Sequence, residues 1–455
     1  MKIIIKVLKF ILLAIVLTST AYSQQVHSAY FSVGQMGNNK GNIIRAYTAG
    51  NMVVMSSFTP EDRITKFSFF KQGSSVVKYI ELPYDYTVND FVILDNYIYF
   101  CGKTSFRNSG YIGMSEISTS LQGTTGYQLL AIDSAATLTK IVAYKGETSS
   151  TIGIVAIGKP KDSAYTSCVV DVNNYRESNL VWKYWYGHIA GEEITDICNA
   201  GALVATVAKV KPSSGLSFFI PALLLRTYKK DNIFAEAMSD AVNKYSNSIH
   251  PYEGGGFLVE QLNANNIVAV GTSKSNLLFT YYYPITISKI NINSFIMTNK
   301  QQITYDSTRS RNIVDLEYFP TTNKLGILTN VPNTFGELLF SDMSKTSSYT
   351  SSRLKRADNL FNSITESNNG DFEITCLARG IMTTNAFILH ENIDIFKESH
   401  CSTTATMPVS AQSVNIAPTI EIKSFDTHNK VANWIHYSTT LYETDVDIHC
   451  ANYYK

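Results

Sequence analysis

The sequence predicts an all-β protein, and its composition is the first of two observations that do so. The 455 residues include 28 Tyr and 23 Phe, while charged residues make up only 16% of the chain. Aromatic and β-branched side chains favour strands, and residues typical of helices are few here. The second observation is a repeated strand pattern.

A short apolar strand that ends near Gly, Lys, Ser or Pro recurs seven times, roughly 45 to 65 residues apart. The copies are NMVVMSS from residue 51, YIYFCGKTS from 97, TIGIVAIGKP from 151, ALVATVAKVKP from 202, NNIVAVGTSK from 265, KLGILTNVP from 324 and FEITCLARG from 372. Further strands are predicted before several copies, from residues 89, 193 and 312, and after others, from residues 110, 167, 221 and 385. Each unit therefore holds three or four strands.

These units need neighbours, because a four-stranded sheet with two apolar faces is unstable until other sheets cover both. The central strand of each unit is continuously apolar, as expected when both of its faces are buried. Over about residues 28–400 the chain resembles the β-propeller superfold of secreted proteins. The resemblance implies a seven-bladed β-propeller of four-stranded antiparallel blades. The segment HSAYFSVGQM, residues 27–36, could complete the last blade.

The resemblance is architectural and implies no activity. The sequence has no Trp-Asp repeat, no recurrent paired glycines of the kelch kind and no Ser-x-Asp-x-Gly-x-x-Trp box of sialidases. A pair of β-sandwiches is the alternative fold. The helix-friendly stretch 239–251 has repeats on both sides, so we interpret it as an insertion and not as a linker between two sandwiches.

The N-terminus predicts export. Three lysines precede an apolar run at residues 10–17, which is shorter than the roughly 20 residues of a membrane span, and the small residues Ala21 and Ser23 follow. This is the pattern of a secretory signal peptide. We expect residues 1–23 to be cleaved and residues 24–400 to form the propeller, secreted, periplasmic or at the cell surface, with no membrane span. The formal charge of +1 gives no basic field for nucleic acid.

Residues 401–455 form a low-complexity connector followed by two or three predicted strands. We expect these strands to close the ring or to form a small appended sheet. Cys401 and Cys450 are the best candidates for a disulfide, which would stabilise the fold by roughly 4 kcal/mol in the loop-entropy model. The pair Cys168 and Cys198 is a weaker candidate.

A zinc site is the alternative for the C-terminal cysteines, because each follows a histidine, His400 or His449. Adjacent side chains of a strand point to opposite faces, so the disulfide is favoured. Asp445, Asp447 and His449 share one strand face, which we interpret as solvated. No metal and no cofactor is therefore expected. Cys101 and Cys376 occupy equivalent apolar strands and are expected to be buried thiols.

Acidic side chains lie near the predicted inner strands, where a propeller channel opens. They are Asp90, Glu193, Asp196, Asp315, Glu317 and Glu366. A pair of them would suit a glycosidase, but such residues more often cap turns at strand ends. The sequence contains no Gly-x-Ser-x-Gly elbow, no His-Glu-x-x-His pair and no phosphate loop.

Clustered aromatic residues suggest binding. WKYWYGH from residue 182 and FTYYYP from residue 279 include Trp182, Trp185, Tyr281 and Tyr283, which we predict as binding residues, although blade packing also explains such rings. The leading hypothesis is a non-enzymatic platform for a protein or glycan partner. The alternatives are a carbohydrate-active enzyme, a hydrolase or lyase with its site at the channel mouth, and a structural subunit of a surface assembly.

Overall fold

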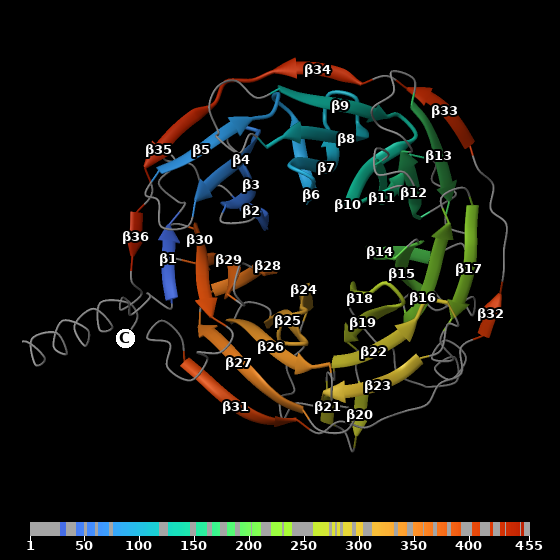
Figure 1. The fold of residues 1–455 in the computed structure, drawn as a ribbon, viewed down its shortest axis with the longest axis vertical. Helices are drawn as coiled ribbons and strands as arrows, with labels where there is room; N and C mark the ends of the chain where they lie inside the picture. Colours follow the sequence, from blue (N-terminus) through green and yellow to red (C-terminus); the bar gives the residue numbers. More distant parts are fainter. Residues whose placement is uncertain are drawn as a thin grey trace, which may run out of the picture.

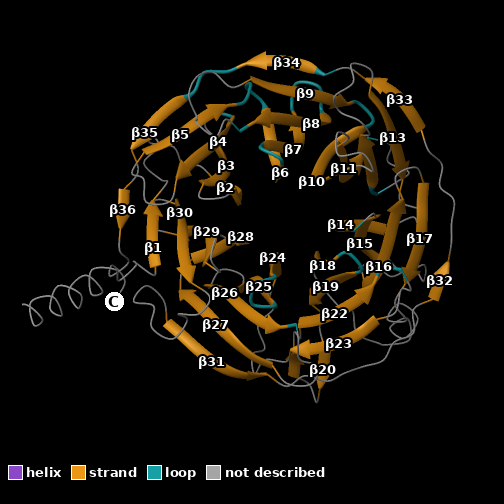
Figure 2. Ribbon diagram, in the orientation of Figure 1, coloured by secondary structure: helices purple, strands orange, loops and turns teal. Residues whose placement is uncertain are grey.

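The computed structural model describes the chain in segments that cover most of the predicted strands. They are residues 28–32, 42–49, 52–59, 62–71, 76–117, 126–145, 152–161, 166–172, 180–186, 192–201, 203–210, 220–229, 232–238, 258–272, 275–277, 280–282, 285–293, 297–303, 312–331, 335–343, 349–357, 359–366, 371–379, 384–392, 403–409, 419–421, 428–432, 434–445 and 447–449. Within these segments the protein is all-β, and every strand pairing is antiparallel (Figure 2). The predicted signal peptide and the stretch 239–251 lie outside the described residues.

The first four large sheets follow the chain order. Sheet 1 contains β2 (Asn42–Ala49), β3 (Met52–Thr59), β4 (Ile64–Lys71) and β5 (Val76–Glu81). Sheet 2 contains β6 (Tyr86–Leu94), β7 (Tyr97–Thr104), β8 (Ser109–Glu116) and β9 (Gly126–Ile132). Sheet 3 contains β10 (Ala135–Lys145), β11 (Ile152–Pro160), β12 (Cys168–Val172) and β13 (Leu180–Tyr186). Sheet 4 contains β14 (Glu192–Ala200), β15 (Leu203–Val210), β16 (Ile220–Lys229) and β17 (Asn232–Met238).

The other three large sheets continue this order. Sheet 5 contains β18 (Leu258–Asn263), β19 (Asn266–Thr272), β22 (Ile285–Asn291) and β23 (Met297–Ile303), with the hairpin of β20 (Ser275–Leu277) and β21 (Thr280–Tyr282) inserted. Sheet 6 contains β24 (Asn312–Phe319), β25 (Lys324–Val331), β26 (Phe335–Asp342) and β27 (Tyr349–Ala357). Sheet 7 contains β28 (Asn359–Glu366), β29 (Asp371–Arg379), β30 (Thr384–Asn392) and β1 (Ser28–Ser32).

The seven repeated apolar segments are the second strands of these sheets, namely β3, β7, β11, β15, β19, β25 and β29. Their burial explains the sequence pattern. In β7 and β11 almost every side chain is buried, because strands pair on both edges and other sheets cover both faces. The predicted flanking strands are also present, including β6, β14 and β24 before the repeat and β8, β12, β16 and β30 after it.

The large sheets lie side by side around a common centre, with their first strands innermost (Figure 1). The N-terminal strand β1 pairs with β30 and so completes sheet 7, as the sequence predicts. Because each sheet is antiparallel, the second-to-third hairpins and the connections to the next sheet lie at the same end of the sheets. We call this end the connection face, and the end with the first-to-second turns the opposite face.

The strands after residue 400 add to the outer edges of the large sheets. They are β31 (Thr403–Val409) on sheet 6, β32 (Thr419–Glu421) on sheet 4, β33 (His428–Ala432) on sheet 3, β34 (Ile435–Ser438) on sheet 2, β35 (Tyr442–Asp445) on sheet 1 and β36 (Asp447–His449) on sheet 7. We call these six strands the C-terminal belt, and Figure 1 shows them in red and orange-red around the outside. The prediction of four-stranded sheets is therefore wrong for six of the seven large sheets.

The apolar core lies between neighbouring sheets. Phe67 of sheet 1 contacts the rings of Phe91 and Phe100 of sheet 2, with ring centroids 5.4 and 5.0 Å apart. A second cluster joins sheets 2 and 3, where Ile112 and Leu138 are fully buried. Burying a side chain of this size stabilises the fold by about 1.5–3 kcal/mol, so each interface makes a large contribution.

A glycine near the end of several of the repeated strands allows a close approach to the first strand. A Cβ atom on Gly102 would lie 1.8 Å from the carbonyl oxygen of Thr87, and one on Gly158 would lie 2.1 Å from that of Thr137. Neither distance is compatible with a side chain. The glycine in the sequence pattern therefore marks the tight packing of the second strand against the first.

Cys101, Cys168 and Cys198 are buried thiols, while the side chain of Cys376 lies outside the described residues. Cys101 has the thiol expected from its apolar strand, but the predicted pairing of Cys168 with Cys198 is wrong, since both are thiols in different sheets. The expected disulfide of Cys401 and Cys450 lies outside the described residues. In the described part of the chain, no helix is long and apolar enough to cross a membrane, and no His, Cys, Asp and Glu side chains form a metal-binding group.

Candidate functional site

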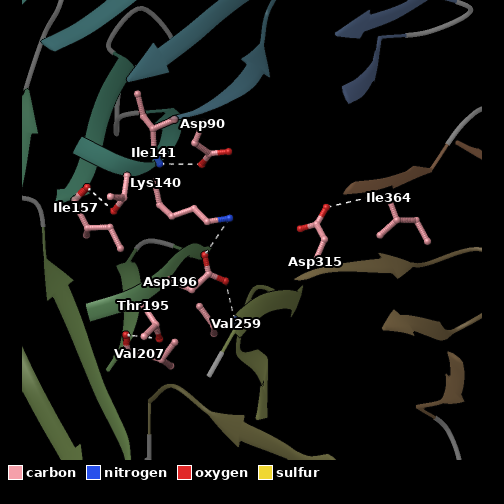
Figure 3. Close-up of polar contacts among 11 residues, drawn as sticks. Asp90, Lys140, Ile141, Ile157, Thr195, Asp196, Val207, Val259, Asp315 and Ile364 are labelled. Atoms are coloured by element: carbon pink, nitrogen blue, oxygen red, sulfur yellow. Dashed lines mark hydrogen bonds and ion pairs between the residues drawn. The ribbon is translucent and has the colours of Figure 1, made fainter. Parts of the chain in front are cut away.

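Three of the predicted acidic residues hold neighbouring sheets together. The Oδ2 atom of Asp90 accepts a hydrogen bond from the main-chain N of Ile141 at 3.0 Å. The equivalent bonds run from the N of Val259 to Asp196 at 2.9 Å and from the N of Ile364 to Asp315 at 3.0 Å. Each bond joins the first strand of one sheet to the first strand of the next, as Figure 3 shows.

A β-bulge places each of these carboxylates. The register of the first strand shifts between Val88 and Asp90, between Ile194 and Asp196, and between Ile313 and Asp315. A bulge inserts one unpaired residue and re-aims the next side chain. The aspartates directly follow the extra residue, and this position turns them towards the neighbouring sheet.

Threonine hydroxyls complete two such bulges. The Oγ1 atom of Thr195 donates to the carbonyl of Val207 at 3.3 Å, and that of Thr139 donates to the carbonyl of Ile157 at 3.2 Å (Figure 3). The extra residue disrupts the main-chain ladder, so a side-chain donor satisfies the acceptor on the second strand. In sheet 3 the residue after the bulge is Lys140 instead of an aspartate.

The three aspartates are poorly placed for catalysis. Asp90, Asp196 and Asp315 are 2%, 8% and 5% exposed, and each accepts a main-chain hydrogen bond. Lys140 of sheet 3 also lies 3.9 Å from Oδ1 of Asp196. These three aspartates therefore have a structural role, as the sequence favoured. They accept hydrogen bonds from the next sheet, however, instead of capping their own turns.

Two other predicted acidic residues, Glu317 and Glu366, are linked through the main chain, and the pKa of Glu366 is raised. The Oε1 atom of Glu317 accepts from the main-chain N of Glu366 at 3.2 Å, and Oε1 of Glu366 accepts from the hydroxyl of Thr321 at 3.3 Å. Burial raises the pKa of Glu366, and the hydrogen bond from Thr321 opposes that rise. Since Glu366 ends β28 beside the β24–β25 turn, the pair lies at the opposite face.

A different cluster is exposed on the connection face. Tyr84, in the connection from sheet 1 to sheet 2, is 60% exposed, and Phe106, in the β7–β8 hairpin, is 87% exposed. They are the two most exposed large apolar side chains of the described residues. Their chain neighbours are bonded directly, since the N of Ser105 donates to the carbonyl of Asp85 at 3.2 Å. The two rings are therefore carried by loops that contact each other.

Arg63, in the β3–β4 hairpin, joins these loops. Its guanidinium forms an ion pair with Asp85, donates to the hydroxyl of Ser105 at 3.0 Å and donates to the hydroxyl of Tyr84 at 3.4 Å. The guanidinium carbon also lies 5.2 Å from the centroid of the Tyr84 ring. One cation thus links three loops and supports an exposed ring. Arginine suits this role better than lysine, because its planar guanidinium has five donors and stacks on aromatic rings.

The backbone of this cluster is strained. Arg63, Asp85 and Asn108 have positive φ angles of 55°, 70° and 45°. The left-handed region is costly for a bulky residue such as arginine, and such residues persist where surrounding contacts hold them. Asn108 donates its N to the carbonyl of Ser105 at 3.4 Å, which closes the hairpin tip that carries Phe106. We call Arg63, Tyr84, Asp85, Ser105 and Phe106 the aromatic loop cluster.

The predicted aromatic binding residues do not form this cluster. Trp182 and Trp185 lie in β13, opposite Val172 and Val169 of β12, and Tyr281 lies in the β20–β21 hairpin of sheet 5. Tyr283 lies outside the described residues. The binding role of these four residues stays a prediction. The sequence signal for Tyr84 and Phe106 is an aromatic residue within a turn, in LPYDY and TSFRNSG respectively. A side chain in a turn contributes little to the core, so an aromatic ring there suggests another role.

Comparisons with known proteins give no assignment. No protein-family model matches the chain, and no curated protein matches it. Among solved structures, the chain is similar to oligopeptidase B from Leishmania major, with a TM-score of 0.33 and 9% sequence identity, over 75% of this chain and 54% of that chain. The chain thus spans about half the length of that protein. A likeness this weak carries no inference about activity.

Proposed function

We propose that the chain is an exported, closed seven-bladed β-propeller that acts as a non-enzymatic binding platform for a protein or glycan partner. The arrangement of the large sheets around one centre supports the propeller (Figure 1). Pairing of β1 with both β30 and β36 supports closure, since both ends of the chain then join the same sheet. Export rests on the N-terminal sequence, and Edman sequencing of the secreted protein should begin at Gln24.

The aromatic loop cluster is the observation that carries the binding role. Aromatic residues are enriched at binding interfaces relative to the rest of a protein surface. Arg63 holds the cluster in one conformation before any partner arrives, which lowers the entropy cost of binding. The buried inner-strand aspartates, by contrast, are used within the fold.

Binding by this cluster can be tested on the mature protein with a glycan array and with capture of partners from its native envelope. We expect Tyr84→Ala combined with Phe106→Ala to abolish binding to any ligand that the wild type retains. Ile435→Ala is the control, because it removes a large apolar side chain that is 45% exposed on the belt. Equal binding by the double variant and the control would remove the loop cluster from the proposal.

A carbohydrate-active enzyme is the second candidate, favoured by the raised pKa of Glu366 beside Glu317. Glycoside hydrolysis uses two carboxyl groups, and a raised pKa suits the one that acts as general acid. Release of reducing ends or of unsaturated products from a panel of polysaccharides would support the enzyme if Glu366→Gln abolished it. If the protein is a non-enzymatic platform, neither the wild type nor Glu366→Gln should release products.

A further inference from the structure

We propose that the connection face of sheets 2 and 3 binds an anionic polysaccharide, with the exposed rings stacking on sugars and a row of cations binding their carboxylates. This inference rests on the binding role proposed above and assigns the ligand class. It adds to the aromatic loop cluster four cations on neighbouring strand ends, namely Lys103, Arg107, Lys159 and Lys161, all of which are exposed.

A hydrogen bond links one cation of sheet 3 to the hairpin that carries Phe106. Lys161, directly after β11, donates from Nζ to the carbonyl of Arg107 at 3.4 Å, and its main-chain N donates to the carbonyl of Ser134 at 2.8 Å. Sheet 3 therefore contacts the same β7–β8 hairpin that carries Phe106. Lys103 and Arg107 belong to that hairpin, three residues before and one residue after Phe106.

The cations are available for a ligand. Within the described part of the chain, none of the four forms an ion pair with a carboxylate, whereas Arg63 is paired with Asp85. Among the described residues, the other carboxylates on these loops are Asp62 and Asp133, both exposed, while Glu61 and Asp162 lie outside the described residues. Counted over the described residues of these loops, four cations without an ion pair stand beside the carboxylates of Asp62 and Asp133.

Alternation of rings and cations fits a chain of acidic sugars. The C–H face of a pyranose is apolar and packs on an aromatic ring, while a uronic acid adds one carboxylate per sugar for Lys or Arg. Phe106 and Arg107 are consecutive at a hairpin tip, so one sugar can contact both kinds of group. Cations on two adjacent sheets extend the surface beyond one sugar and favour a polymer.

An acidic peptide is a poorer fit to the same surface. Peptide anchors insert side chains into enclosed pockets that exclude water. Phe106 is 87% exposed and Tyr84 is 60% exposed, so these rings project outwards and enclose nothing. A projecting ring offers a flat face, which a sugar can cover and a peptide side chain cannot fill.

The test compares two polymers that differ only in charge. Polygalacturonate and its fully methyl-esterified form have the same sugars and linkages, but only the first carries free carboxylates. We expect the mature protein to bind polygalacturonate at least ten-fold more tightly than the ester by biolayer interferometry. Raising the salt from 0.05 to 0.5 M should weaken only the polygalacturonate complex, because salt screens exposed charges.

Variants separate the two parts of the site. Phe106→Ala should weaken binding to both polymers about ten-fold, while Arg107→Gln with Lys161→Gln should weaken only the binding of polygalacturonate, by a similar factor. Lys145→Gln is the matched charge control, since Lys145 is exposed in sheet 3 but is paired with Asp95 at the opposite face. It should bind as the wild type does.

Failure of this inference can be told from failure of the platform. Equal affinity for both polymers, or stronger binding to poly-glutamate than to polygalacturonate, would overturn the anionic polysaccharide and leave the loop cluster as a binding site, provided that Phe106→Ala still weakened binding. Charge-dependent binding that Phe106→Ala and the double cation variant leave unchanged would overturn both. Retained melting temperatures would show that the variants are folded.

Discussion

Tyr437 of the C-terminal belt stacks on Tyr127 at the outer edge of sheet 2, with ring centroids 5.3 Å apart and an interplanar angle of 18°. The two residues are direct cross-strand partners. Sheet 1 repeats this contact, where Tyr442 is the partner of Tyr79 and their centroids lie 5.2 Å apart at 22°. The belt is therefore held in register by aromatic pairs as well as by main-chain bonds.

The belt contacts predict that its removal destabilises the protein. Deleting residues 428–455 would expose the outer edges of β13, β9, β5 and β1, and unpaired edges invite association with other chains. We expect a lower melting temperature by circular dichroism and new oligomers in light scattering after size-exclusion chromatography. Tyr442→Phe retains the stacked ring and should behave as the wild type does. A truncated monomer with an unchanged melting temperature would contradict this role.

Replacing an inner-strand aspartate should cost stability by leaving a buried donor unsatisfied. Asp315→Ala removes the acceptor for the main-chain N of Ile364, and such a loss costs about 1–3 kcal/mol in the free energy of unfolding. Asp315→Asn retains an oxygen and should cost less. Urea denaturation measures both, with Asp62→Ala as an exposed control. A loss as small as that of the control would show that the bond between the sheets contributes little.

These aspartates show why part of the fold is predictable and part is not. The second strands were predictable because burial on both faces produces a continuous apolar run, as in β7. The role of Asp90 was not, because its partner Ile141 lies 51 residues away in another sheet. The sequence around Asp90 is equally compatible with a turn cap.

The sequence did not predict the belt or the aromatic loop cluster, for different reasons. β34 has four residues, of which three are exposed, so its sequence has no pattern of burial and only the free edge of β9 defines it as a strand. The loop cluster depends on Arg63, whose partners Asp85 and Ser105 come from other loops. The exposed ring of Phe106 in a polar turn was the one local signal.

A side chain at Gly102 should disrupt the contact between β6 and β7. The Cβ of Gly102→Ala would lie 1.8 Å from the carbonyl oxygen of Thr87, which is main chain and cannot rotate away. We expect a large drop in melting temperature or loss of soluble protein, since overpacking by backbone displacement costs about 1–3 kcal/mol or more. Gly126→Ala is a milder comparison, with a nearest atom at 3.1 Å. Similar effects of the two substitutions would contradict this reading of the repeat glycine.

Buried tyrosines of sheet 2 should make the protein sensitive to alkali. Burial raises the pKa of Tyr86, Tyr111 and Tyr127 above the ordinary value of 10, and the neighbouring hydroxyl of Tyr437 adds to the rise for Tyr86 and Tyr127. The folded protein therefore retains protons that the unfolded chain releases from about pH 10 upwards.

The stabilisation from these protonated tyrosines is complete below pH 10 and is lost as the pH rises through their folded pKa values. We expect less tyrosinate absorbance at 295 nm in the native protein at pH 11 than in urea, and a melting temperature that falls steeply above pH 10. Tyr111→Phe removes a hydroxyl whose pKa burial raises strongly, and it should make that fall shallower. An identical pH profile for Tyr111→Phe and the wild type would show that another group controls alkaline unfolding.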